Sequence, residues 1–87
     1  MLILGTPVMQ EREAKLLHKS NDLGGIVIEQ ATNKKGWIVK ITDKNNSNHY
    51  LVSKRDDQKP RNFKTSDAAL RCCMRIGFSQ VEVAMRF

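Results

Sequence analysis

The feature that most restricts how this chain can fold is a short amphipathic helix with clear signals at both ends. Residues 60–78 read PRNFKTSDAALRCCMRIGF. Thr65 or Ser66 can cap the helix by accepting a hydrogen bond from its first turn, and Gly77 suits the left-handed position that ends it. At helical spacing, five apolar residues share one side: Ala69, Leu70, Cys73, Met74 and Ile76. Because only one side is apolar, we expect this helix to lie on a sheet.

Three β-like runs precede this helix and one follows it. Residues 25–31, 37–42 and 49–54 contain β-branched or aromatic residues and are separated by polar turns. Residues 80–87 alternate between apolar and polar side chains, as a half-buried strand does. The sequence therefore predicts an α+β fold, in which an antiparallel three-stranded meander packs on one helix and a fourth strand lies at an edge.

Residues 1–23 precede this core as an N-terminal helix or arm. Thr6 as a cap and Pro7 in the first turn are typical of a helix start, and residues 10–19 contain good helix formers. The apolar face of this helix is thin: Val8, Met9, Leu16 and Leu17. We expect one small domain over residues 1–87, with a β-β-β-α-β core over residues 24–87.

Composition indicates a cytoplasmic protein with no membrane partner. No apolar run approaches the roughly 20 residues of a membrane span, and residues 1–4 are too short for a secretory signal and lack a basic flank. The two cysteines are adjacent, and neighbouring side chains in a helix diverge too far to form a disulfide. We interpret Cys73 as a core residue and Cys72 as a reduced thiol at the edge of the apolar face; an intermolecular bridge or a redox role is the alternative.

No pattern in the sequence indicates catalysis. The chain has no glycine-rich phosphate loop, no paired-carboxylate pattern and no Cys/His set at metal-ligand spacing. His18 and His49 belong to separate predicted elements, whereas zinc needs four converging ligands. Asp56 and Asp57 fit a solvated charged loop better than an acid–base pair. We therefore expect a protein that is not an enzyme and has no cofactor and no metal.

The positive charge is concentrated in one part of the chain. The net charge is +6, and residues 34–64 alone contain nine basic and three acidic side chains. Such a distribution favours nucleic acid, because lysine and arginine release counterions from phosphates, and a small sheet can enter the major groove of double-stranded DNA. A basic face that only confers solubility is the alternative. The candidate nucleic-acid-binding residues are Lys34, Lys35, Lys40, Lys44, Lys54, Arg55 and Arg61.

The predicted order of three antiparallel strands and one packed helix resembles two families of DNA-binding domain. These are the AP2-type domain and the arm-binding domain of phage integrases, and the resemblance covers residues 25–78 in topology, with residues 36–41 (GWIVKI) and the helix start at Asp67 similar in character. The stretch from Pro60 to Lys64, running into Asp67, resembles small plasmid partition-associated proteins. These resemblances imply a DNA-binding accessory protein of plasmid or phage origin.

A protein-interaction module is the alternative function. The last predicted strand ends at Phe87 as a sheet edge, which could pair with a strand of a protein partner or of a second copy in a homodimer. A small mobile-element inhibitor that binds a nucleic-acid-handling complex through its sheet edge or charged face would have the same features. Salt dependence separates these functions, because counterion release makes DNA binding steeply sensitive to salt.

Overall fold

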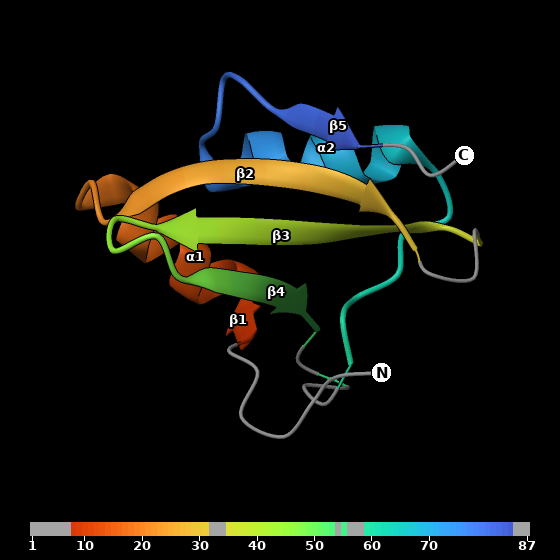
Figure 1. Ribbon diagram of the computed structural model, residues 1–87, viewed down its shortest axis with the longest axis horizontal. Coiled ribbons are helices and arrows are strands. Elements are labelled where there is room, and N and C mark those ends of the chain that lie inside the picture. Colours follow the sequence, from red (N-terminus) through yellow and green to blue (C-terminus); the bar gives the residue numbers. More distant parts are fainter. Residues whose placement is uncertain (1–7, 32–34, 54, 56–58, 85–87) are drawn as a thin grey trace.

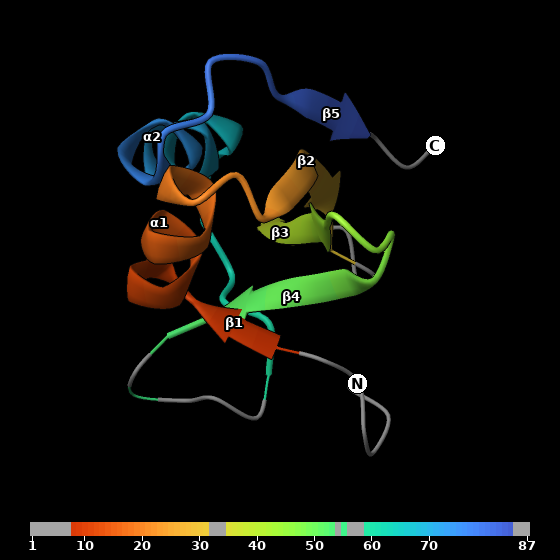
Figure 2. The ribbon, with the colours of Figure 1, turned by 90° about the vertical axis from the view of Figure 1, so that its left-hand side faces the viewer.

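The computed structural model describes residues 8–31, 35–53, 55 and 59–84, and this part of the chain forms five strands and two helices in two layers (Figure 1). The elements are β1 (Val8–Gln10), α1 (Glu11–Lys19), β2 (Leu23–Gln30), β3 (Trp37–Asp43), β4 (Asn48–Val52), α2 (Ser66–Ile76) and β5 (Glu82–Ala84). The strands form one sheet in the order β1-β4-β3-β2-β5, and both helices cover the same face of it (Figure 2). The fold is α+β, as predicted.

The centre of the sheet is the predicted meander, and the two edges extend it. Strand β3 pairs antiparallel with both β2 and β4. Strand β1 joins β4 in parallel, with Met9 opposite Leu51, and β5 joins β2 in parallel, with Val83 opposite Ile28. The sheet is therefore mixed. Helix α1 connects β1 to β2 and helix α2 connects β4 to β5, and each connection is long enough for the second strand to run in the same direction as the first. The prediction of a meander with one edge strand was right for the centre and incomplete at the edges.

The first part of the described chain differs from the prediction. Val8 and Met9 belong to β1, so their assignment to the apolar face of the N-terminal helix was wrong. The helix begins at Glu11, and pairing of β1 with β4 buries Met9 almost completely. This pairing overrides the local helix signals. In the sheet, Val8 is partly buried and Met9 is almost completely buried, and this burial stabilises the strand more than the first turn of a helix, which frays, would be stabilised. The predicted cap and first-turn proline, Thr6 and Pro7, lie outside the described residues.

The ends of α2 agree with the sequence. The Thr65 hydroxyl accepts a hydrogen bond from the backbone N–H of Ala68 at 3.1 Å. Gly77 has φ +126°, in the left-handed region that favours glycine, and its N–H donates to the Cys73 carbonyl. Phe78 then turns back, so that its N–H reaches the same carbonyl.

The buried side of α2 is rotated relative to the prediction. The residues that face the sheet are Ala69, Cys72, Cys73 and Ile76. Cys72 is fully buried rather than at the edge of the apolar face, and Leu70 and Met74 are 38% and 63% exposed rather than in the core. Helix α2 packs over β2 and β3 and also against α1, which turns its Cys72 side inward. Both cysteines are free thiols.

The hydrophobic core lies between the helices and the sheet. Val39, Ile28, Ile41 and Leu51 supply its fully buried sheet residues, and Trp37 packs against its margin from the start of β3. Among the described residues, neither helix is long and apolar enough to cross a lipid bilayer.

Candidate nucleic-acid interface

A short segment, residues 59–63, crosses the ends of β4 and β3 before α2 begins; we call it the crossing segment. The N–H of Arg61 donates to the Leu51 carbonyl at 2.8 Å. Phe63 and Trp37 each donate their N–H to the carbonyl of the other, both at 2.8 Å. The crossing segment is therefore held to the sheet by backbone hydrogen bonds, which limits the positions that its side chains can take.

A glycine allows the crossing segment to approach this closely. Gly36 has φ +92°, and a Cβ at this position would overlap the Asn62 amide and lie 2.8 Å from the Phe63 carbonyl oxygen. The Asn62 amide also donates to the Lys35 carbonyl at 3.0 Å. The crossing segment is thus bound to the turn that contains Lys35 and Gly36, as well as to β3 and β4.

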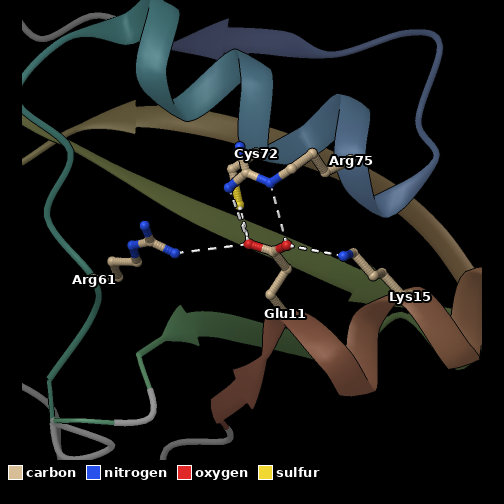
Figure 3. A network of polar contacts seen from close by, with 5 residues as sticks. All are labelled: Glu11, Lys15, Arg61, Cys72 and Arg75. Carbon is tan, nitrogen blue, oxygen red and sulfur yellow. Dashed lines mark hydrogen bonds and ion pairs between the residues drawn. The ribbon is translucent and has the colours of Figure 1, made fainter.

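The carboxylate of Glu11, at the start of α1, joins both helices to the crossing segment (Figure 3). Arg75 donates to both of its oxygens, at 3.1 and 3.3 Å, and the Cys72 thiol donates to Oε1 at 3.3 Å. Lys15 Nζ lies 3.2 Å from Oε2, and Arg61 Nη1 lies 3.7 Å from Oε1. We call these five residues the Glu11 junction.

The Glu11 junction is arranged for structure rather than for proton transfer. The hydrogen bonds from Arg75 outweigh partial desolvation and lower the pKa of Glu11 to about 2. Burial, together with the hydrogen bond to Glu11, raises the pKa of the Cys72 thiol to about 12. At neutral pH Glu11 is therefore ionised and Cys72 is a thiol, and the pKa of each lies far from the neutral range in which proton transfer is efficient.

An open depression of about 650 Å³ lies beside the Glu11 junction. Its wall includes Gln10 and Val52, the last residues of β1 and β4, and the first part of the crossing segment. Four basic residues line it: Arg12, Arg55, Lys59 and Arg61. We call it the basic depression. Glu11 is its one acidic residue among those described, and the Glu11 carboxylate is already bound by Arg75, Lys15 and Cys72, with Arg61 as a further ion-pair partner from the depression itself.

The structure brings two of the predicted binding residues together and separates three others. Arg55 and Arg61 both line the basic depression. Lys40 lies on the sheet face opposite the helices and forms an ion pair with Glu29 at 3.2 Å. Lys44 forms an ion pair with Asp22 at 2.8 Å in the turn after β3. Lys35 is exposed at the turn before β3.

Two further predicted binding residues, Lys34 and Lys54, lie outside the described residues, as do the neighbouring Asp56 and Asp57. Sequence reasoning missed Arg12 and Lys59 as site residues. Lys59 was part of the basic region but carried no distinguishing pattern. Arg12 comes from a part of the chain with a slight negative balance, so only the fold could bring it to the same depression.

The histidines do not form a metal site in the described part of the chain, where no group of three or more candidate ligands converges. His49 Nε2 lies 2.9 Å from an Asp43 oxygen, and this contact lowers the pKa of Asp43. The His18 ring meets the Phe78 ring edge-on at a centroid distance of 4.8 Å. Each histidine thus makes a local packing or polar contact within the fold.

No family model, curated protein or solved structure matches this chain.

Proposed function

We propose that this protein binds nucleic acid at the basic depression, as a small accessory protein that contacts the phosphates of double-stranded DNA. The observation that supports this proposal most strongly is the convergence of four basic side chains, from α1, the segment after β4 and the crossing segment, on one open hollow. The acidic residue in the same wall is neutralised by its own partners. The hollow therefore offers an excess of positive charge to a ligand.

The chemistry of the wall suits phosphates better than bases. Arginine presents a planar fork that matches phosphate oxygens, and lysine adds a compact charge. The described wall contains no aromatic ring on which an unpaired base could stack. Contacts of this kind position a duplex without reading its sequence, so we expect binding to be tolerant of sequence and strongly salt-dependent.

The surroundings hold part of this charge in place before a ligand arrives. The guanidinium carbon of Arg61 lies 4.7 Å from the centre of the Phe63 ring, and the Arg61 backbone is bonded to β4. A side chain held by stacking loses less entropy on binding than a free one.

The test is fluorescence anisotropy with a labelled duplex and a labelled single strand, each of random sequence, at low and at physiological salt. The site variant carries Arg55→Glu and Lys59→Glu. The control variant carries Lys19→Glu and Arg71→Glu, which changes the net charge equally at two exposed positions on the helices. We expect the wild-type protein to prefer the duplex, and the site variant to bind it about tenfold more weakly or worse than the control.

Equal losses in both double variants would show that only the overall charge matters, and would remove the basic depression as the site. If the wild-type protein binds neither probe at low salt, the nucleic-acid proposal is wrong, and an acidic protein surface becomes the ligand to test. A preference for the single strand would contradict the assignment to duplex phosphates.

A further inference from the structure

The β5 edge of the sheet carries a group of apolar side chains that the fold leaves exposed. Four large hydrophobic side chains are exposed among the described residues, and three of them, Leu70, Met74 and Val83, belong to α2 and β5. Both views place α2 and β5 at the same end of the molecule, away from β1 (Figures 1 and 2). We call Leu70, Met74 and Val83 the β5-edge patch.

The directions of these side chains follow from the register and from helical geometry. Val83 is paired with Ile28, which is fully buried beneath the helices, so Val83 faces the helix side of the sheet. Cys72 and Arg75 reach Glu11 on α1. Leu70 and Met74 are four residues apart and lie on the opposite flank of α2, away from α1. The three side chains therefore border one strip, along the outer side of α2 and above β5.

The backbone at this edge has no strand beyond it in the described part of the chain. Strand β5 is the last in the sheet order, and it pairs with β2 through three residues. Sheet edges that must stay unpaired are usually protected by charged residues, prolines or bulges. Strand β5 has one charged residue, Glu82, at its first position.

We propose that the β5-edge patch is the interface for a second copy of this chain, which joins edge to edge through antiparallel pairing of the two β5 strands. A two-fold axis perpendicular to the sheet keeps the helices of both copies on the same face. The two Val83 side chains then meet at the centre, flanked by Leu70 and Met74 of both copies. The interface is thus apolar above a continuous sheet.

The charges of this region permit a second copy, whereas those of the opposite edge oppose it. Helix α2 and β5 together carry two acidic and two basic residues: Asp67, Glu82, Arg71 and Arg75. Pairing centred on Val83 places Glu82 opposite Ala84 of the second copy, so that like charges do not meet. The β1 edge lies beside the basic depression, where two copies would bring basic side chains together.

The experiment is sedimentation velocity on the full chain over a series of concentrations, at physiological salt and without nucleic acid. Met74→Glu is compared with Leu16→Glu, because both side chains are 63% exposed and Leu16 lies beside β1. We expect the wild-type protein and Leu16→Glu to dimerise alike as concentration rises. Met74→Glu should dimerise about tenfold more weakly or remain monomeric, because a carboxylate would be buried in the apolar strip.

Three results would overturn the proposal: a wild-type protein that is monomeric at every concentration, a Met74→Glu variant that dimerises as well as wild type, or a Leu16→Glu variant that dissociates at least as much as Met74→Glu. Circular dichroism verifies that each variant is folded, and Leu70→Glu replaces Met74→Glu if the latter is not. Since no nucleic acid is present, the result is independent of the function proposed for the basic depression.

Discussion

The β1 side and the β5 side of the sheet are built from different interactions. At the β1 side, the carboxylate of Glu11 joins α1, α2 and the crossing segment, and the basic depression lies beside it. At the β5 side, a three-residue strand pairs with β2, and three large apolar side chains of α2 and β5 are exposed. At one end of the molecule, ion pairs of the Glu11 junction hold the elements together. At the other end, the apolar side chains of the β5-edge patch are exposed to solvent.

This difference shows how a small basic domain can hold like charges close together. Three basic side chains have a charged nitrogen within 4 Å of the Glu11 carboxylate: Lys15, Arg61 and Arg75. The negative charge of this carboxylate offsets the repulsion between them. Among the described residues, the β5 side has no comparable set of like charges to balance. We therefore expect the folding stability of the monomer to depend far more on the charged end than on the β5 edge.

The largest effect is expected from Glu11→Gln, which removes the charge at the centre of the Glu11 junction. The amide leaves three basic groups without a counter-charge, so the free energy of unfolding should fall by about 2 kcal/mol, the range for losing hydrogen bonds to a charged group. Urea denaturation at neutral pH measures it. Glu13→Gln is the control: Glu13 is exposed in the same turn of α1, and its replacement should change stability by less than about 0.5 kcal/mol. Equal losses in the two variants would show that the junction does not stabilise the fold.

The pH dependence of stability should reveal the same carboxylate. The pKa of Glu11 in the folded protein is about 2, below its ordinary value of 4.5. Its contribution is therefore fully present above about pH 4.5 and is lost as the pH falls towards about 2. In urea denaturation at stepped pH, the stability of the wild-type protein should fall more steeply over this interval than that of Glu11→Gln, until the two curves converge. Curves that stay parallel would contradict the low pKa.

A smaller effect is expected from glycine substitutions at the two ends of the β2–β3 pair. Gly36→Ala forces a side chain onto a left-handed backbone and against the Phe63 carbonyl oxygen, so it should cost more than about 1 kcal/mol and loosen the crossing segment. Gly25→Ala is the matched control at the start of β2, where a Cβ would have no neighbour within 4 Å. Its effect should stay within about 0.5 kcal/mol. Thermal or urea unfolding compares the two, and similar losses would mean that the crossing segment is not held by this close approach.

Local signals in the sequence were sufficient for the elements that depend on near neighbours. Thr65 and Gly77 mark the ends of α2 because capping and left-handed termination involve residues within a few positions of each other. The three strands of the meander followed from short turns and alternating residues. The assignment of the helix face was less accurate, because Leu70 and Met74 are as apolar as the residues that are buried. Which apolar side faces inward depends on where α1 packs.

The candidate site was only partly visible in the sequence, for the same reason. The basic character of residues 34–64 identified Arg55 and Arg61. Their grouping with Arg12 and Lys59, and the pairing of Lys40 and Lys44 with carboxylates elsewhere, depend on residues that are far apart along the chain. Charge counted along a sequence does not distinguish a basic side chain that is already paired from one that faces a hollow.

By itself the sequence determined the α+β class, the antiparallel meander, the ends of α2 and the overall positive charge, since each depends on composition or on neighbours along the chain. Only the tertiary structure decided that Val8 and Met9 form an edge strand, that Glu11 joins the two helices, and which basic residues share a depression. Those features arise from contacts between distant segments, whose free energy exceeds the local preferences and leaves no periodic signal in the chain.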